Sequence, residues 1–162
     1  MNIYIFFFKK SHIKKILVKK LNINNRRAYF DYELINKYKF IAGIELLGSE
    51  VKSIKNNNVS LNNSYCKLIK NNIYVFDMYI SNYLLGINFN PKRVKKLLLK
   101  RKEINFIYNK INELKLNIIP TNIFINERGY IKLIFFLAKS KKNYDKRQSI
   151  KNKYFEREKN IF

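Results

Sequence analysis

Residues 117–138 read NIIPTNIFINERGYIKLIFFLA. Two runs rich in Ile and Phe flank the sequence NERG, which is typical of a hairpin loop whose glycine takes the left-handed backbone position. Pro120 has no amide hydrogen, so it predicts an edge or a bulge in the first strand. The unbroken apolar run 133–137 indicates either burial on both faces of the second strand or drift in composition toward hydrophobicity. The stretch therefore predicts an antiparallel hairpin of two strands, 117–125 and 130–138.

The rest of the chain adds further strands and two helices. Residues rich in aromatic and β-branched types predict a strand over 29–47, and two more strands, 64–70 and 73–80, flank an Asn-Asn pair suited to a tight turn. A short helix is predicted over 49–55, with Ser at its N-cap and Glu in its first turn. Apolar residues at helical spacing predict a longer helix over 102–116. We therefore expect an α+β, mostly β fold, an antiparallel OB-like β-barrel with about two to three flanking helices.

Charge is the extreme property of this chain. Its 34 Lys and Arg against 11 Asp and Glu give a formal net charge of +23. Such self-repulsion opposes compaction and is tolerable when the partner is a polyanion, so nucleic acid is the natural candidate. Codon drift in an AT-rich genome is a second interpretation, and we expect both to apply. Drift alone would not concentrate seven basic residues and no acidic one in the run 92–102 around a central Leu triplet.

The sequence carries no recognisable equipment for catalysis. Cys66, the single cysteine, lies in a strand-like run and fits a small buried residue better than a nucleophile. The single histidine, His12, is remote in sequence from any acidic residue. The sequence has no Gly-rich phosphate loop, paired-carboxylate motif or Cys-rich metal site, and no apolar run approaches the ~20 residues that span a bilayer. We therefore expect no enzyme activity, no cofactor, no metal site and no membrane partner.

Three segments are predicted along the chain. Residues 1–24 form a basic N-terminal extension, 25–138 form the folded domain, and 139–162 form a basic tail with nine basic and three acidic residues. Because the tail has too few apolar residues for a core of its own, we expect it to be disordered when free and partly helical when bound. The alternative is a solvated helix packed on the domain.

Four segments stand out as motifs. They are Asn25-Arg26-Arg27-Ala28 with Asp31-Tyr32; Ala42-Gly43-Ile44 with Leu47-Gly48-Ser49-Glu50-Val51-Lys52-Ser53-Ile54; Arg93 with Lys96-Leu97-Leu98-Leu99 and Glu103; and Leu137-Ala138-Lys139 with Lys141-Lys142 and Tyr144-Asp145-Lys146-Arg147. In this order and spacing they resemble the signatures of the SsrA-binding protein family (small protein B). One segment alone would be weak evidence, whereas four in register are strong.

The resemblance implies an OB-like barrel that binds the transfer-RNA-like domain of transfer-messenger RNA (tmRNA, SsrA RNA) near its elbow. It implies a tail that enters the decoding centre and the empty messenger channel of the small ribosomal subunit, so that trans-translation rescues the stalled ribosome and tags the unfinished peptide. On this basis we expect a monomer in the bacterial cytoplasm, or in an organelle stroma if the gene is organellar. A ribosomal or generic basic RNA-binding protein is the main alternative. A nuclease and a membrane-surface binder are more distant ones.

The predicted site residues combine this resemblance with positive charge and with aromatic rings that stack on bases at about 1–3 kcal/mol each. The predicted RNA-binding residues are Asn25, Arg26, Arg27, Tyr29, Phe30, Lys52, Arg93, Lys95, Lys96, Leu98 and Lys132. The tail residues predicted to meet the ribosome are Lys139, Lys141, Lys142, Tyr144, Asp145, Lys146, Arg147, Lys151 and Phe155. Core packing is the competing interpretation for the aromatic rings and for Leu98, and a solvated face is the competing interpretation for the lysines.

Three positions depart from the family pattern. Ile41 stands where members often have an acidic residue, so any polar RNA contact from that side chain is lost. Phe30 replaces a frequent histidine and keeps a ring for stacking without an imidazole donor. Ser140 replaces a glycine and is expected to stiffen the junction between barrel and tail.

Overall fold

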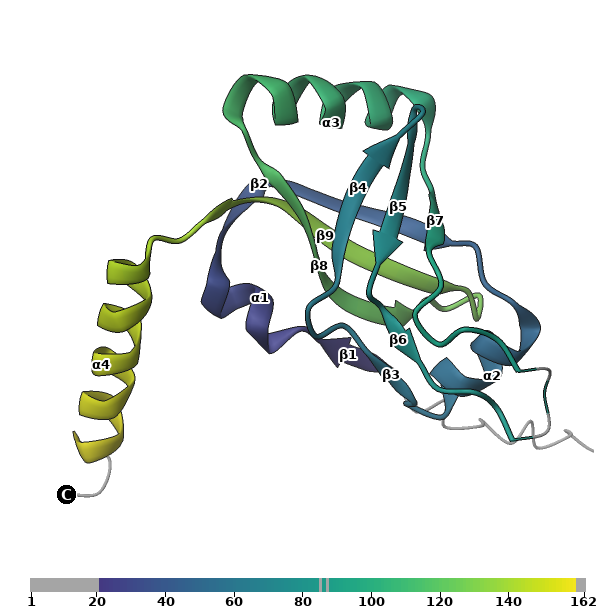
Figure 1. Cartoon of the computed structure of the whole chain (residues 1–162), viewed down its shortest axis with the longest axis horizontal. Coiled ribbons are helices and arrows are strands. Elements are labelled where there is room, and N and C mark those ends of the chain that lie inside the picture. Colours follow the sequence, from purple (N-terminus) through teal and green to yellow (C-terminus); the bar gives the residue numbers. More distant parts are fainter. Residues whose placement is uncertain (1–20, 85, 87, 160–162) are drawn as a thin grey trace, which may run out of the picture.

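The structure is a computed structural model that describes residues 21–84, 86 and 88–159. Within its last helix, the side chains of 143–146, 149, 153, 158 and 159 lie outside this description. Four helices and nine strands follow one another in the described part of the chain (Figure 1). In order they are β1 (Asn22–Asn24), α1 (Arg26–Asp31), β2 (Tyr32–Ile44), α2 (Gly48–Lys55), β3 (Val59–Ser60), β4 (Tyr65–Ile69), β5 (Asn72–Phe76), β6 (Tyr79–Ile80), β7 (Lys95–Leu98), α3 (Arg101–Leu114), β8 (Asn117–Ile125), β9 (Ile131–Ser140) and α4 (Asn143–Lys159).

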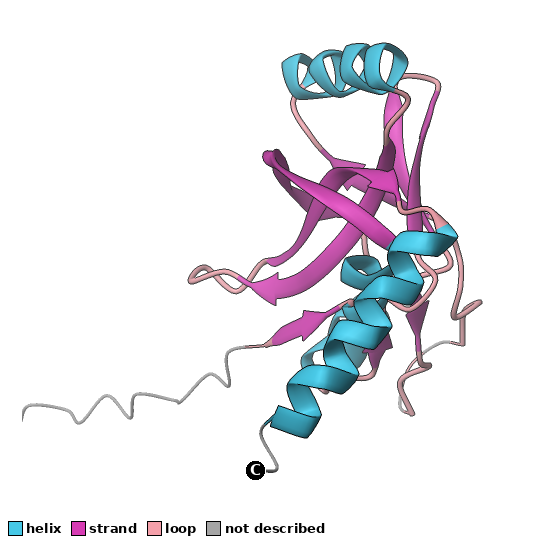
Figure 2. Cartoon of the chain, turned by 90° about the vertical axis from the view of Figure 1, so that its left-hand side faces the viewer, coloured by secondary structure: helices cyan, strands magenta, loops and turns pink. Residues whose placement is uncertain are grey.

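Seven of the strands form one sheet that closes on itself. The strand order is β1-β8-β4-β5-β7-β2-β9, and a further pairing joins β8 to β9, which brings the two sides of the sheet together. The pairings are antiparallel throughout. β3 and β6 make a separate two-stranded antiparallel sheet. The predicted α+β, mostly β class is confirmed, and the strands form a ring (Figures 1 and 2).

The inside of the ring is the hydrophobic core. Leu133, Phe135 and Leu137 of β9 point into it and are fully buried, and β5 contributes Ile73 and Val75 in the same way. Because successive side chains of a strand point to opposite faces, the residues between these positions lie on the outside of the ring. The apolar area buried here stabilises the fold by about 25 cal/mol per Å².

A second, smaller cluster lies on the outside of the ring, beneath α1. Ala28 of α1 packs there with Ile119 of β8 and Ala138 of β9, and all three are buried. Residues 135–138 of β9 are therefore buried on both faces of the strand, which confirms one interpretation of the apolar run for this part of it.

Both predicted hairpins are present. The loop between β8 and β9 contains Gly129 with φ +81°, a left-handed conformation that other residues rarely adopt. The register of β8 against β9 shifts between Pro120 and Asn122, so the proline lies at a bulge, as predicted. In the hairpin of β4 and β5, Lys70 and Asn71 have positive φ and form the turn, one residue earlier than the predicted Asn-Asn pair.

The two predicted helices correspond to α2 and α3, which lie toward opposite ends of the ring (Figure 1). In α3, the Glu103 carboxylate accepts a hydrogen bond from the Lys100 backbone N–H at 2.8 Å. The N-cap of α2 is Leu47 and not the predicted Ser49. The reason is that the Glu50 carboxylate accepts the Leu47 backbone N–H at 2.8 Å, which satisfies the first turn without a serine cap.

The predicted start of the domain needs two corrections. Residues 29–31, expected in a strand, belong to α1, because the Asn25 side chain caps this helix by accepting the Ala28 backbone N–H. β1 lies within the residues assigned to the extension, where it pairs with β8, and Leu21 before it is buried. Residues 1–20 of the predicted extension lie outside the described part of the chain.

The predicted end of the domain moves by two residues. β9 continues to Ser140, and Lys139 and Ser140 pair with Glu33 and Tyr32 of β2. The tail proper is α4, a helix that projects from the ring and lies beside α1 (Figures 1 and 2). The tail is helical in this structure, and its disorder in the free chain stays a prediction. Among the described residues, no helix is long and apolar enough to cross a bilayer.

Candidate RNA interface

Strand β7 divides the basic run 92–102 between two environments. Lys95 and Leu97 point into the ring and are buried, whereas Lys96 is half-buried and Leu98 is exposed on the outside. This is the ordinary alternation of a strand. A run that looks uniformly basic in the sequence therefore supplies one row of residues to the surface and another to the interior.

The outward residues of β7 continue into a row across three strands, which we call the Leu98 row. Gly43 of β2 lies opposite Leu98 of β7 on one side and opposite Lys132 of β9 on the other. A Cβ atom at Gly43 would lie 3.3 Å from the Cβ of Leu98, so a larger side chain there would press on the leucine. Leu98 itself is 56% exposed, a high value for a leucine within a sheet.

Two hollows flank the Leu98 row. One has a volume of about 440 Å³ and includes Lys96, Lys100 and Lys132 in its lining. The other, of about 260 Å³, lies between Val51 and Tyr130 and shares Lys132. Ile41 borders the larger hollow and is 52% exposed. The larger hollow also includes Glu103, so three lysines and one carboxylate border its apolar centre. Such a surface offers contact to bases and a net attraction to phosphates.

The inward residues of the same segment form a buried charged cluster, which we call the Glu50 cluster. Glu50 of α2 is fully buried, and its carboxylate accepts hydrogen bonds from Arg93 at 2.8 Å and 2.5 Å. Lys95 is also fully buried; its Nζ lies 3.8 Å from the Glu50 carboxylate and donates to the backbone carbonyls of Met78 and Arg93. The cluster joins α2 to β7.

Burial dominates the electrostatics of Lys95. Burial lowers the pKa of the Lys95 ammonium, and the charge of Arg93 lowers it further. The Glu50 carboxylate raises this pKa, and the net value is about 8. Because Lys95 has no exposed surface, its prediction as an RNA contact is wrong. Arg93 retains some exposure, but its guanidinium is used by Glu50 and by the carbonyl of Glu45.

A second part of the candidate interface lies on and around α1. Asn25, predicted to face RNA, is 2% exposed, so that prediction is also corrected. Its side chain accepts the Ala28 N–H and donates to the carbonyl of Pro120, which ties α1 to β8. Arg26 is exposed and remains available. Asn25, in contrast, has a structural role that accounts for its place in the motif.

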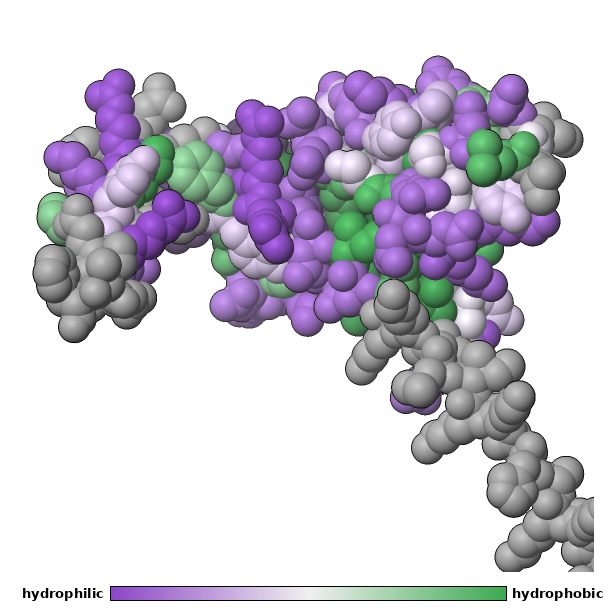
Figure 3. All heavy atoms as spheres, turned by 90° about the horizontal axis from the view of Figure 1, so that it is seen from below, coloured by the Kyte–Doolittle hydropathy of each residue, from purple (hydrophilic) through white to green (hydrophobic). Residues whose placement is uncertain are grey.

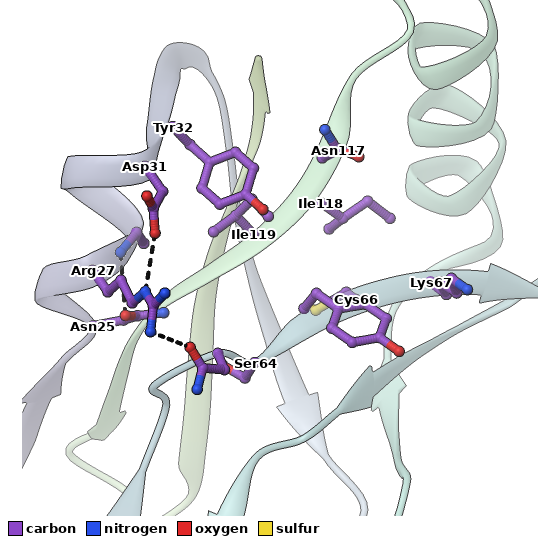
Figure 4. Close-up of a pocket in the computed structure, with 13 residues that line it drawn as sticks. Asn25, Arg27, Asp31, Tyr32, Ser64, Cys66, Lys67, Asn117, Ile118 and Ile119 are labelled. Atoms are coloured by element: carbon purple, nitrogen blue, oxygen red, sulfur yellow. Dashed lines mark hydrogen bonds and ion pairs between the residues drawn. The ribbon is translucent and has the colours of Figure 1, made fainter. Parts of the chain in front are cut away.

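Arg27 is held by two partners across a cavity of about 360 Å³ next to α1 (Figure 4). Its guanidinium donates to the Asp31 carboxylate at 3.1 Å and to the side-chain oxygen of Asn63 at 2.7 Å. The arginine is exposed but positioned, so it presents its remaining N–H groups in a fixed direction.

The two predicted aromatic residues of α1 also differ in burial. Tyr29 is exposed, and its hydroxyl lies 3.4 Å from the Asn122 side chain. Phe30 is half-buried and lines a hollow with Ile150 and Tyr154 of α4. The backbone carbonyl of Tyr29 accepts a hydrogen bond from the Lys141 ammonium, so the start of the tail is attached to α1.

The remaining predicted residues lie apart from the Leu98 row. Lys52 extends from α2 over the ring of Tyr83, with 5.2 Å between its Nζ and the ring centroid. In the tail, Lys139, Lys142, Arg147, Lys151 and Phe155 are exposed. Tyr144, Asp145 and Lys146 belong to α4 by their backbone, and their side chains lie outside the described part. Hydrophilic side chains cover most of the face shown in Figure 3, including much of the projecting α4.

Sequence reasoning missed the partners that order these groups. Glu50 was expected to act only on the first turn of its helix, yet it pairs with Arg93, 43 residues away. Asn63, the partner of Arg27, was not singled out. No local pattern reveals such pairs, because they depend on which strands lie side by side. The lack of any acidic residue in the run 92–102 was the one signal that its charges needed a partner distant in sequence.

Comparison with known proteins identifies the family. The SmpB protein family model matches residues 22–161. The SsrA-binding protein of Cytophaga hutchinsonii is 42% identical over 146 residues, which is 89% of this chain and 94% of the relative. That of Bacteroides thetaiotaomicron is 44% identical over 135 residues, 82% of this chain and 89% of the relative. A chain in the solved structure "tmRNA-SmpB: a journey to the center of the bacterial ribosome" matches with a TM-score of 0.63 and 36% identity, over 76% of this chain and 86% of that chain. The chain belongs to the SmpB family of SsrA-binding proteins.

Proposed function

We propose that the protein binds tmRNA and acts as the adaptor that brings it to stalled ribosomes for trans-translation. Its family membership, its relatives named SsrA-binding proteins and a structural match to a chain in a tmRNA–SmpB structure support this function. Its role is binding and not catalysis. The single cysteine fits this role, because burial raises the pKa of the Cys66 thiol and disfavours a reactive thiolate.

The observation that carries the proposal is the Leu98 row. An exposed leucine beside a glycine, bordered by Lys96 of β7, Lys132 of β9 and Lys100 at the start of α3, has no role in the core. On a protein of net charge +23 it provides shape and apolar contact in addition to charge. Such a surface suits a folded RNA whose elbow exposes unstacked bases and 2′-hydroxyls. We propose that this row binds the tRNA-like domain of tmRNA.

The ribosome-facing part of the proposal rests on α1 and the tail. Arg26 and Tyr29 of α1 and Lys142 just before α4 are exposed. α4 lies beside α1 on one side of the ring (Figure 2). We propose that this side meets the decoding centre and that the cationic α4 segment enters the empty messenger channel, where phosphate contacts offset the entropy of ordering it.

The proposal also covers the type of barrel, the oligomeric state and the location of the protein. The closed ring of six strands β8-β4-β5-β7-β2-β9 supports an OB-like barrel, the class expected from the sequence. We propose that the protein acts as a monomer, because one chain supplies both the Leu98 row and the tail. We also propose the bacterial cytoplasm, or an organelle stroma, as its location.

A gel-shift titration tests the function directly. The purified chain is titrated with full-length tmRNA in the presence of a tRNA competitor, at several salt concentrations. We expect a preference for tmRNA and an affinity that falls steeply with salt. Equal affinity for tmRNA and for an unrelated RNA of the same length would favour the generic RNA-binding alternative.

The division of labour between domain and tail has its own test. Cutting the chain after Lys142 leaves β9 intact, since this strand ends at Ser140. The truncated protein should bind tmRNA within about twofold of the full chain, because the cut leaves the Leu98 row untouched. It should fail to support peptide tagging in a reconstituted translation assay. Normal tagging would contradict the proposed role of α4.

A further inference from the structure

The outer face of β4, β5 and β7 carries an unusual set of residues for an exposed sheet surface. On β4 and β5 the outward positions include Tyr65, Lys67, Tyr74 and Phe76, and β7 adds Lys96. We call these five residues the aromatic platform. Their inward neighbours, such as Cys66 and Val75, fill the core. The rings of the platform are therefore not needed to close the ring of strands.

The strand register places the five residues in two adjacent rows. Tyr65 lies opposite Phe76, and the two rings are stacked with centroids 5.4 Å apart and planes 9° apart. In the next row Lys67 lies opposite Tyr74, which in turn lies opposite Lys96. The Lys67 ammonium lies 5.7 Å from the centroid of the Tyr65 ring. Aromatic rings and ammonium groups thus alternate across the surface.

The platform is positively charged and open. β4, β5 and β7 contain no Asp or Glu, and Lys67 is exposed. The three strands run side by side at the front of Figure 1, where no helix crosses them. Tyr65, Tyr74 and Phe76 are half-buried, so part of each ring is accessible.

This combination matches one kind of partner. A strand surface with rings flanked by lysines binds unpaired nucleotides, because each base stacks on a ring while its phosphate meets an ammonium group. A duplex offers no free base faces, and an acidic protein would not use the rings in this way. We propose that the aromatic platform binds an unpaired segment of RNA, at a site distinct from the Leu98 row.

The inference rests on the proposed function only in taking RNA as the partner. Lys96 belongs to the platform and also lines the hollow beside Leu98. One RNA molecule could therefore engage the folded elbow at the Leu98 row and place an adjoining single-stranded segment on β4 and β5. Two sites on one RNA would raise both affinity and selectivity.

The test uses the full chain and a short oligouridylate that contains 4-thiouridine. Irradiation should cross-link this probe to peptides that contain Tyr65 or Tyr74, as mapped by mass spectrometry. The triple variant Y65L, K67Q and Y74L removes two rings and one charge on the outer face and leaves the core residues in place. Its affinity for the oligouridylate should fall about tenfold, while its affinity for an RNA duplex with the same number of phosphates should change less than about twofold.

A control variant with the same loss of charge, Y79L with K55Q, removes one tyrosine and one lysine that are exposed elsewhere. It should bind both probes like the unmodified chain. Cross-links confined to peptides outside 65–76, or equal losses for the oligouridylate in the two variants, would overturn the platform. Preference of the unmodified chain for tmRNA over tRNA is measured in parallel. If the unmodified chain binds tmRNA and tRNA equally well, the proposed function is contradicted. The oligouridylate measurements still decide whether the aromatic platform binds unpaired RNA.

Discussion

The two faces of β7 place the same residue types in opposite roles. Toward the inside, Lys95 is 0% exposed and shares the Glu50 carboxylate with Arg93. Toward the outside, Lys96 and Leu98 border open hollows with no acidic residue paired to them in the described part of the chain. Position along the strand, and not residue type, decides whether a lysine belongs to the core or to the surface.

The difference teaches how a very basic protein keeps a folded core. A buried charge is tolerated only with a partner and with its hydrogen bonds made, and the Glu50 cluster meets both conditions. An exposed lysine needs neither, so the outside of β7 is free to serve a polyanion. Substitutions on the two faces should therefore change different measurable quantities: the free energy of unfolding on the inside, and RNA affinity on the outside.

The largest effect is expected from Glu50→Gln. The substitution removes the only carboxylate within ion-pair distance of Arg93 and Lys95 among the described residues, and it leaves two cations together in a buried site. We expect the free energy of unfolding to fall by about 3–5 kcal/mol, as measured by urea denaturation. The control is Glu45→Gln, at an exposed position, which should change it by less than about 0.5 kcal/mol. Equal stabilities of the two variants would show that the cluster does not hold α2 to β7.

Substitutions of the neighbouring residues Leu97 and Leu98 compare the two faces of β7 without any change in charge. Leu97→Ala should cost about 2–5 kcal/mol of unfolding free energy, because Leu97 is buried in the core. Leu98→Ala should leave the unfolding free energy within about 0.5 kcal/mol, because the side chain is exposed. It should weaken tmRNA binding about tenfold, since the proposed contact with RNA loses its apolar group. Denaturation and gel-shift titrations on both variants separate the two outcomes. A large loss of stability in Leu98→Ala would assign this residue to the core after all.

The next effect is a pH dependence that belongs to the inside of β7. The pKa of Lys95 is about 8 in the folded protein, below its ordinary value of about 10.4, so the unfolded chain binds more protons between these values. Stability should therefore rise as the pH increases from 8 to 10.4, by an amount on the order of 1–3 kcal/mol. Lys95→Met removes the titrating group. Its unfolding free energy, measured over the same range, should lack this part of the rise. Parallel pH curves for the two proteins would contradict the assignment to Lys95.

The sequence predicted what local patterns determine. The hairpin of β8 and β9 follows from NERG and from Ile and Phe on both sides, and α3 follows from apolar spacing. The mostly β class followed from the strand-like runs, and the family was recognised because several motifs agreed. By contrast, Asn25 lies in a motif that resembles an RNA site, and its side chain is in fact buried against the carbonyl of Pro120, 95 residues away. Sequence alone could not reveal this role, because the contact exists only once β8 is in place.

The basic run 92–102 also shows what sequence alone could not predict. Charge counting identified 92–102 as a candidate interface, and Lys96 and Leu98 do face outward, so their contact with RNA stays a prediction. Lys95 was assigned wrongly because strand alternation was not applied to a segment whose strand was not predicted. Once β7 is known, alternation alone assigns each lysine to its face. The missing information was thus a single secondary-structure element.

The smallest expected effect is a change in salt dependence on the outside of β7. If Lys96 contacts one phosphate, Lys96→Gln should lower the slope of log affinity against log salt by about 0.7–0.9, with a loss of affinity that disappears at high salt. The unfolding free energy should stay within about 0.5 kcal/mol of the unmodified chain, because no acidic residue in the described part of the chain forms an ion pair with this ammonium group. The matched control is Lys55→Gln on α2, which removes the same charge from an exposed position away from the Leu98 row. Both variants have the same net charge, so a general attraction of RNA to a basic protein would lower their slopes equally, whereas a specific contact changes the slope of Lys96→Gln alone.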